Sequence, residues 1–310
     1  MLEVIEAGLL STVQAGSRRE ALAYGVPPGG ACDGWSLALA NALLGNAAQA
    51  PGVEMTLTGL TVRALADCWL ALAGADMEPS IDGRQVPAGR PVRLAQGERL
   101  VCGAARPGSG IRSYLALPGG LDVPEVLGSP STCLVGGFGG LDGRSLRAGD
   151  RLRPAAGGPS VIGRWEDARS DLGAPLRVVP GPHADELPGA FEALLAGDFV
   201  VSARGDRQAI RLEGGQLPAG SGTIVSQPMM WGAVQLPPDG RPIVLLADHQ
   251  TVGGYPVPAV VISADLPRLG QLGPGDTLRF IPIGLAQARA ELAAHRRALG
   301  RLPELVAVGA

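Results

Sequence analysis

The sequence predicts a mainly β protein with few helices, and three observations support that prediction. Its 310 residues include 47 glycines and 27 prolines, which alternate with apolar runs instead of forming low-complexity tracts. Most apolar runs have the length of a strand and are too short for a helix. Only a few stretches place apolar residues at helical spacing. Many short strands with few helices favour barrels or sandwiches over a parallel α/β sheet.

Strands are expected in both halves of the chain. Those of the first half are Leu2–Glu6, Trp69–Leu72, Val92–Leu94, Arg99–Cys102 and Ser113–Leu117. Those of the second half are Leu176–Val179, Phe199–Ser202, Ala209–Leu212, Gly222–Val225, Ile243–Leu246, Val257–Ser263 and Thr277–Phe280. Between the two sets, residues 154–174 mix Gly, Pro, Asp and Arg without a steady period, as a linker does. The sequence therefore predicts an N-terminal β unit over residues 1–160, a C-terminal β unit over 175–284, and a helix with a tail over 285–310.

Three helices are expected within or after these units. Gly34–Leu44 contains good helix formers, and Asp33 stands at the N-cap position, where its carboxylate accepts from the first amides. Pro188–Leu195 predicts a short helix with proline in the first turn. Leu285–Leu299 is alanine-rich with apolar residues at helical spacing, which predicts a C-terminal helix.

A short pattern recurs along the chain. Leu146–Leu152 (LRAGDRL) parallels Leu272–Leu278 (LGPGDTL), and Leu94–Leu100 (LAQGERL) is a looser third copy. Each places glycine and an acidic residue just before an outgoing strand. The pattern is either a recurring hairpin turn or a sign that the two halves are related β units.

The net charge and the lengths of the apolar runs argue against two classes of protein. The formal net charge is −3, which argues against nucleic-acid binding. No apolar run approaches the roughly 18–20 residues that span a bilayer, and the N-terminus lacks a basic start followed by an apolar signal core. A cytoplasmic protein that does not cross a membrane is therefore expected.

Two residue types restrict the chemistry further. The four cysteines, Cys32, Cys68, Cys102 and Cys133, form no CxxC pair, so reduced cysteines and no metal site are expected. The sequence contains no lysine. It therefore lacks the amine that a Walker-type phosphate loop, a Schiff base or covalent biotin attachment requires.

The most informative polar segment lies between two apolar strands. Asp248–Thr251 (DHQT) precedes the turn Gly253–Pro256 (GGYP), and buried polar groups in such a place must satisfy their hydrogen bonds. The segment is either one wall of a binding site or a structural turn network. A second glycine-rich segment, Gly25–Asp33, leads into the first helix, and it either holds an anion at the helix start or is a loop capped by Asp33.

Several segments, in their order along the chain, carry a resemblance to a known family over residues 2–283. They include Gly8–Gln14, Gly25–Asp33, Leu39–Asn41, Glu54–Thr56, Ala73–Asp76, Leu117–Val123, Leu127–Thr132, Gly137–Gly140, Val179–His183, Gly222–Ser226, Gln235–Gly240 and Pro242–Phe280. Together they resemble the carboxyltransferase-like family, which includes the C-type subunit of 5-oxoprolinase, allophanate hydrolase subunit 2 and the carboxyltransferase domain of urea carboxylase. The resemblance implies two cyclophilin-like β-barrel units.

The resemblance also implies a function and partners. It implies one component of an ATP-dependent complex that opens the lactam of 5-oxoproline to glutamate, together with B-type and A-type subunits. The substrate would be a small amide, and ATP would be bound by or with a partner subunit. Two alternatives are a non-catalytic regulatory subunit, like the family's kinase-inhibitor antagonist, and a carboxyltransferase acting on a urea-like substrate. Biotin would then arrive on another chain.

The site expected from residue chemistry and family position is a cleft. Its expected catalytic residues are Asp33, Glu54 and Asp248, and its expected substrate-binding residues are Arg18, Asn41, Gln250, Thr251 and Tyr255. The chain departs from the family pattern at Ala15, where an acid is usual, at Ala23, where His is common, and at Gln227, where Glu is usual. Because losing a carboxylate that acts as a general base lowers activity strongly, these departures favour the regulatory alternative.

Overall fold

The computed structural model describes residues 1–310 except 87–88, 157, 160–162, 166–171, 221–222 and 309–310. The chain folds into two compact units. Unit 1 comprises Met1–Arg18, Gly29–Arg169 and Arg297–Ala310, and unit 2 comprises Arg19–Pro28 and Ser170–Arg296. Part of the predicted linker at 154–174 lies outside the described residues, so its role as a linker stays a prediction.

In its described residues, unit 1 contains one helix of its own and eleven strands. Its elements are β1 (Leu2–Glu6), β2 (Leu10–Gln14), α1 (Gly34–Leu43), β3 (Gly52–Thr56), β4 (Thr61–Ala64), β5 (Cys68–Gly74), β6 (Ser80–Ile81), β7 (Arg84–Gln85), β8 (Val92–Leu94), β9 (Arg99–Val101), β10 (Arg112–Ala116) and β11 (Arg151–Leu152).

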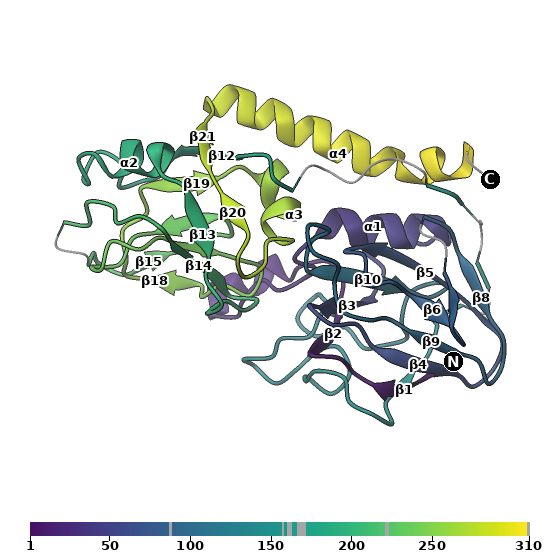
Figure 1. Ribbon diagram of the computed structural model, residues 1–310. Coiled ribbons are helices and arrows are strands. Elements are labelled where there is room, and N and C mark those ends of the chain that lie inside the picture. Colours follow the sequence, from purple (N-terminus) through teal and green to yellow (C-terminus); the bar gives the residue numbers. More distant parts are fainter. Residues whose placement is uncertain (87–88, 157, 160–162, 166–171, 221–222, 309–310) are drawn as a thin grey trace. The chain divides into compact units, whose positions relative to one another are not determined.

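These strands form a six-stranded sheet, in the order β11-β1-β4-β9-β6-β7, and a five-stranded sheet, in the order β2-β3-β10-β5-β8. Short connections carry the chain from one sheet to the other, as between β1 and β2, β3 and β4, and β8 and β9 (Figure 1). Apolar side chains of both sheets share one core, among them Leu2, Val62, Val53 and Leu115. This arrangement buries one face of each sheet.

Helix α1 covers the other face of the five-stranded sheet, where it packs on β5 and β10 (Figure 1). Leu37 and Leu43 of α1 belong to one buried cluster with Ala71 and Tyr114 of the sheet. The helix begins after Asp33, whose carboxylate accepts from the Ser36 N–H, so the predicted N-cap is confirmed. Both faces of β3 and β10 are buried as a result.

Unit 2 contains the remaining elements. They are η1 (Arg19–Tyr24), β12 (Leu176–Pro180), α2 (Ala190–Ala196), β13 (Phe199–Val201), β14 (Ala209–Glu213), β15 (Gln227–Pro228), β16 (Ala233–Gln235), β17 (Ile243–Leu245), β18 (Val252–Gly253), β19 (Ala259–Val261), η2 (Ser263–Asp265), α3 (Leu266–Leu269), β20 (Thr277–Leu278), β21 (Phe280–Pro282) and the first part of α4 (Leu285–Val308).

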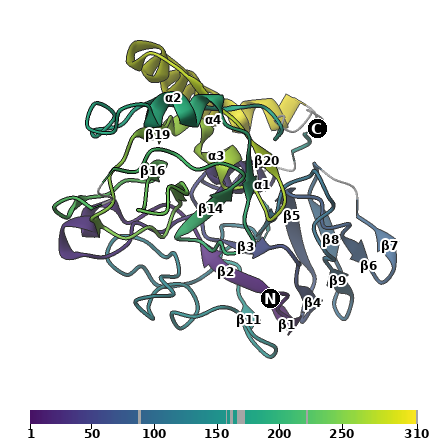
Figure 2. The same cartoon turned by 60° about the vertical axis from the view of Figure 1, so that its left-hand side comes forward.

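One eight-stranded sheet dominates unit 2, in the order β20-β13-β14-β17-β16-β19-β12-β21. Its two outermost strands, β20 and β21, are consecutive along the chain and separated only by Arg279, so the sheet curls into a nearly closed barrel. Figures 1 and 2 show β14 and β19 of this sheet from two sides. Alternate residues such as Ile210, Val234 and Val244 fill the interior. β15 and β18 pair separately as a two-stranded ribbon.

The recurring pattern of the sequence is one turn used three times. In each copy the backbone N–H of the first turn residue donates to an acid three residues later, at distances of 2.7–2.9 Å. The glycine between them has a φ of +89° at Gly97, Gly149 and Gly275, a value that other residues rarely adopt. The turns lead into β9, β11 and β20. Both units therefore build strand entries from the same local device.

The C-terminal helix α4 is divided between the two units: its residues up to Arg296 belong to unit 2 and those from Arg297 to unit 1. Its first part is tied to β12 in unit 2 by the ion pair between Arg177 and Glu291, at 3.0 Å. Its last part contributes Leu302 and Val306 to the buried cluster that contains α1 in unit 1. The helix extends to Val308, beyond the predicted end at Leu299.

The mainly β fold class, with few short helices and a C-terminal helix, is confirmed. The predicted strand Gly222–Val225 is wrong where the structure describes it, because 223–225 carry no strand and the pairing residues are Gln227 and Pro228; Gly222 itself lies outside the described residues. The predicted strand Val257–Ser263 is shorter, since its end turns into η2. Among the described residues, no helix combines the length and apolar character needed to cross a bilayer.

Barrel closure in unit 2 generates a prediction about stability. Phe280 of β21 packs edge-on against Phe199 of β13, with ring centroids 5.9 Å apart, and both are buried. Phe280→Ala should lower the free energy of unfolding by about 3–5 kcal/mol, because it leaves a cavity where the barrel closes. Urea unfolding measures the change. Ile281→Ala, at the next and 42% exposed position, is the control and should cost less than about 1 kcal/mol; equal losses would contradict this account of closure.

Candidate functional site

The residues predicted to form the cleft divide between the two units. Arg18, Asp33, Asn41 and Glu54 belong to unit 1, whereas Asp248, Gln250, Thr251 and Tyr255 belong to unit 2. The two sets have different surroundings.

Glu54 is the centre of a buried polar network in unit 1. It lies on the α1-facing side of β3, opposite Tyr114 of β10. Its Oε2 accepts from the Tyr114 hydroxyl at 2.7 Å and from the Cys32 backbone N–H at 2.9 Å, and Arg112 Nε lies 3.6 Å from Oε1. The Tyr114 oxygen also accepts from the Asp33 backbone N–H at 2.8 Å. Burial, followed by the nearby Glu54 charge, raises the pKa of Tyr114 well above its ordinary value, so the hydroxyl stays a donor.

The other predicted unit 1 residues are also held by their surroundings. Both carboxylate oxygens of Asp33 accept from Ser36, one from its N–H and one from its hydroxyl. Because this carboxylate caps α1, the loop before the helix is a capped loop, and its own side chain occupies the place of an anion. Asn41 donates to the Ala50 carbonyl at 2.9 Å and thereby fixes the turn after α1.

Arg18 is buried in unit 1. Its Nη2 donates to the Ser131 carbonyl, and its guanidinium lies over the Phe138 ring, 5.1 Å from the centroid. Such cation–π contacts hold an arginine in place at low exposure. The roles of Arg18, Asp33, Asn41 and Glu54 in substrate handling stay predictions.

In unit 2, Asp248 forms a buried ion pair. Its two carboxylate oxygens accept from Arg207 Nε at 2.9 Å and from Arg207 Nη2 at 3.1 Å, and both side chains are buried. The residues Asp248 and His249 stand in a turn after β17, not on a strand. The structure therefore makes Asp248 part of a turn network, one of the two alternatives considered for this segment, and its catalytic role stays a prediction.

His249 follows in the same turn and is 2% exposed. Its Nδ1 lies 2.7 Å from the Gln250 carbonyl oxygen, to which it donates. Burial lowers the pKa of His249 below its ordinary 6.5, an effect that the hydrogen bond and the Asp248 charge partly oppose.

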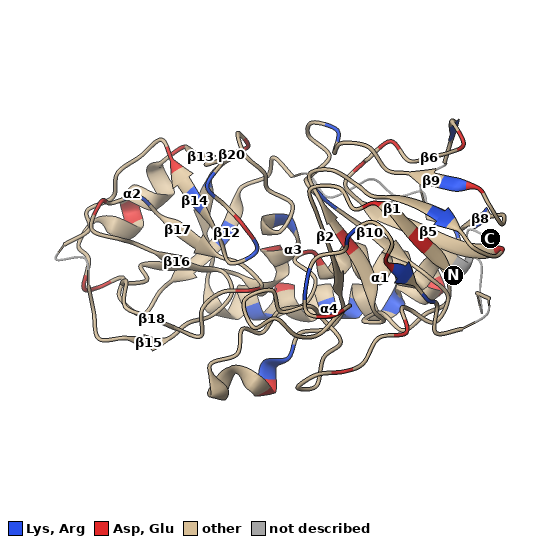
Figure 3. Cartoon of the chain, turned by 90° about the horizontal axis from the view of Figure 1, so that it is seen from below, with Lys and Arg blue, Asp and Glu red and all other residues tan. Residues whose placement is uncertain are grey.

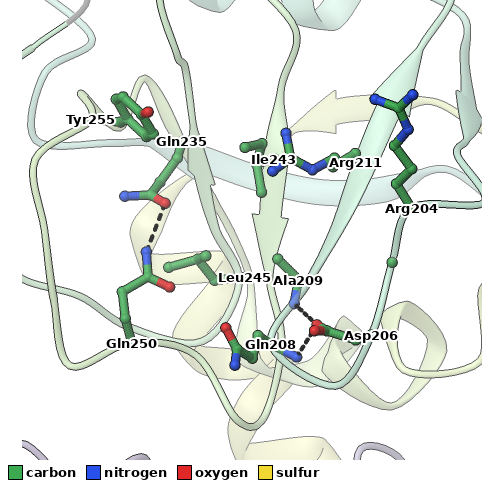
Figure 4. A pocket seen from close by; sticks show the side chains of 11 residues that line it. Arg204, Asp206, Gln208, Ala209, Arg211, Gln235, Ile243, Leu245, Gln250 and Tyr255 are labelled. Carbon is green, nitrogen blue, oxygen red and sulfur yellow. Dashed lines mark hydrogen bonds between the residues drawn. The ribbon is translucent and has the colours of Figure 1, made fainter.

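One cavity of unit 2 lies on the outer face of the barrel sheet and has a volume of about 430 Å³ (Figure 4). Its floor comes from strand register: Arg211 of β14 is opposite Ile243 of β17, which is opposite Gln235 of β16. Ala209 and Leu245 form the next row. The lining residues are Arg204, Gly205, Asp206, Gln208, Ala209, Arg211, Gln235, Ile243, Leu245, Gln250 and Tyr255.

Two of the predicted site residues, Gln250 and Tyr255, line this cavity, whereas Asp248 and Thr251 do not. Gln250 Nε2 donates to Gln235 Oε1 at 3.0 Å, which joins the turn to the sheet floor (Figure 4). Tyr255 is 38% exposed at the edge. Asp248 therefore builds the turn, whereas Gln250 faces the cavity, and the role of this segment as a wall of a binding site stays a prediction.

Sequence reasoning missed Arg204, Arg211 and Gln235 as candidates. A signal for Arg211 was present, because in AIRLE (Ala209–Glu213) the apolar residues Ile210 and Leu212 point inward and place Arg211 outside. The pairing that sets Arg211 and Gln235 in one row joins strands far apart in sequence, and no local pattern reveals it.

The departure at Gln227 has a partner in unit 2. Gln227 Nε2 lies 3.3 Å from His183 Nε2, while His183 Nδ1 accepts from the Val257 backbone N–H at 3.1 Å. His183 is buried by this contact and does not stand free at a loop tip.

Among the described residues, neither the distribution of charged side chains nor a cluster of metal-ligating side chains indicates a second site. Basic and acidic positions are interspersed in each unit (Figure 3). Within the described parts of the chain, no group of three or more His, Cys, Asp or Glu side chains is placed to hold a metal ion. The cavity described above is the candidate site for a small molecule.

Comparison with known proteins settles the family. The family model described as the carboxyltransferase domain, subdomain A and B, matches residues 24–282. The chain belongs to this family. This chain is 39% identical to the C-type subunit of 5-oxoprolinase from Escherichia coli over 290 residues, which cover 93% of both proteins.

Other relatives of this carboxyltransferase-domain chain are much longer. It is 31% identical to the urea amidolyase of Lachancea kluyveri, covering 93% of the chain but only 17% of that protein. The crystal structure of the Kluyveromyces lactis urea carboxylase superposes with a TM-score of 0.86 at 27% identity, covering 97% of the chain and 29% of the carboxylase. These relatives are enzymes or parts of enzymes, and the same fold is embedded in the larger ones.

The unit 1 network generates a prediction for Tyr114. Tyr114→Phe should lower the free energy of unfolding by about 1–3 kcal/mol, because it leaves the buried Asp33 N–H without its acceptor. Urea unfolding tests this. Tyr24→Phe, at an 84% exposed position, is the matched control and should change stability by less than about 0.5 kcal/mol. An unchanged stability of Tyr114→Phe would contradict the network.

The depressed pKa of His249 predicts a pH dependence. Below about pH 6.5 the unfolded chain binds a proton that the folded chain resists, so the stability present above that pH decreases as the pH falls towards the lowered pKa. Urea midpoints measured from pH 8 to 5 should show a smaller decrease for His249→Asn, whose amide keeps a donor near the Nδ1 position. Identical pH profiles for the two proteins would rule out this contribution.

Proposed function

We propose that this chain is the C-type subunit of an ATP-dependent 5-oxoprolinase-type complex. With B-type and A-type subunits it would open the lactam of 5-oxoproline to glutamate. The observation that carries the proposal is the end-to-end match with the C-type subunit of a 5-oxoprolinase, which covers 93% of both chains. The urea amidolyase match, by contrast, covers only 17% of that protein.

The reaction needs protein groups that recognise the lactam amide of 5-oxoproline and the carboxylate beside it. Lactam hydrolysis breaks the ring C–N bond; water supplies the oxygen of the new carboxylate and a proton to the leaving nitrogen, and ATP cleavage drives the step. The cavity of unit 2 offers guanidinium and amide groups above an apolar floor. ATP would be bound by or with a partner subunit.

One observation favours carboxyl transfer as a second candidate. The urea carboxylase superposes over nearly the whole chain. Because the chain contains no lysine, biotin for such a reaction would arrive on a separate carrier. A regulatory role without catalysis is the third candidate, and the departures at Ala15, Ala23 and Gln227 favour it.

Reconstitution tests the proposal. The chain purified together with its A-type and B-type partners should hydrolyse ATP in response to 5-oxoproline and release glutamate. A preparation that omits only this chain is the control and should be inactive. A fully assembled complex that shows no response to 5-oxoproline would refute the proposal, and turnover with urea and carboxylated biotin carrier would replace it by carboxyl transfer.

A further inference from the structure

The outer cavity of unit 2 contains an unusual set of charges. Arg204 and Arg211 both line it, and no ion pair of either is present among the described residues. The acidic lining residue, Asp206, uses Oδ1 to accept from the backbone N–H groups of Gln208 and Ala209, at 2.7 and 3.2 Å (Figure 4). The lining therefore carries a net charge of +1, which favours an anionic ligand group.

The amide groups of the cavity have a fixed orientation. Gln235 is 2% exposed, and its Nε2 donates to the Met229 sulfur at 3.4 Å. A thioether only accepts, so Gln235 must turn its oxygen towards Gln250, which donates from Nε2. The Gln250 oxygen is then left as an acceptor, and Figure 4 shows it directed towards the Leu245 side of the cavity.

These two features define the chemistry of the ligand. An acceptor of fixed direction selects a ligand N–H, and the guanidinium groups select an anion. A ligand ammonium would supply N–H donors too, but the positive charge of the lining opposes it. The donor is therefore a neutral group, as the N–H of an amide is.

Size and position restrict the ligand further. Arg211 and Gln235 are two strand spacings apart across Ile243, about 10 Å between their backbones. Long side chains from both sides shorten that gap, so a ligand that contacts both is small. Ile243 and Leu245 supply an apolar surface between the polar ends.

We infer that this cavity is a binding site for small carboxylates that carry a neutral amide or lactam N–H. Arg211, with Arg204 beside it, binds the carboxylate, and Gln250, oriented by Gln235, accepts from the N–H. The inference rests on the proposed function for its choice of probe and deepens it, because it assigns the substrate to residues of unit 2 alone.

The test measures binding to the full chain without ATP or partner subunits, by calorimetry or ligand-observed NMR. 5-Oxoproline should bind saturably. 2-Pyrrolidinone, which lacks the carboxylate, and 5-oxotetrahydrofuran-2-carboxylate, which has a ring oxygen in place of N–H, should each bind about 10-fold or more weakly. Equal affinity for all three compounds would overturn the inference.

Substitutions of the proposed contact residues test which side chain binds which group of the ligand. Arg211→Gln and Gln250→Leu should each weaken 5-oxoproline binding by about 10- to 100-fold. Arg241→Gln removes the same charge from an exposed arginine that does not line the cavity, and should leave binding unchanged. Gln250→Leu should also abolish the preference for 5-oxoproline over the lactone, whereas a merely structural role would leave that ratio intact.

Failure of this inference is distinguishable from failure of the proposed function. Binding that depends on Arg211 and Gln250, with no turnover in the assembled complex, would keep the site and refute the 5-oxoprolinase activity. Turnover in the complex at a rate insensitive to both variants, with no binding to the chain alone, would keep the activity and overturn the site.

Discussion

Closure of the unit 2 sheet on itself is the constraint on which the candidate site depends. Since β20 and β21 are separated only by Arg279, the last strand returns to the start of the sheet and the interior must be filled by alternate side chains. Ile210, Val234 and Val244 take those inner positions. Their neighbours Arg211, Gln235 and Ile243 are then forced into one row on the outer face.

Polar side chains in this protein divide into two kinds. Glu54 and Asp248 are buried and satisfied by charge-assisted hydrogen bonds, as the cost of burying a lone carboxylate requires. They stabilise particular turns and strand pairs. Arg204 and Arg211 line a cavity, and neither forms an ion pair with an acid among the described residues. The cavity thus presents basic and amide side chains, whereas the carboxylates of Glu54 and Asp248 are engaged in the fold.

The family relationship and the cavity contribute different information. The same fold forms a separate protein in the 5-oxoprolinase relative and a fraction of a much longer chain in urea amidolyase. Fold therefore does not determine the reaction, and the donors at the site must do so. The site proposed above, in which the arginine pair binds an anion and Gln250 accepts a hydrogen bond, would favour a carboxylated lactam over urea, which has no anionic group.

The sequence by itself determined the fold class, the family, many of the strands, the capped helix after Asp33 and the three glycine-acid turns. The family came from the resemblance of many ordered segments, and the other features follow from local rules: side-chain alternation, capping chemistry and the positive φ that glycine tolerates. It also indicated the Asp248–Tyr255 segment as polar residues that needed partners. Only the tertiary structure decided which of them build the turn and which face a cavity. Strand pairing brings Arg211, Gln235 and Gln250 together from separate segments, and no local pattern encodes which strands become neighbours.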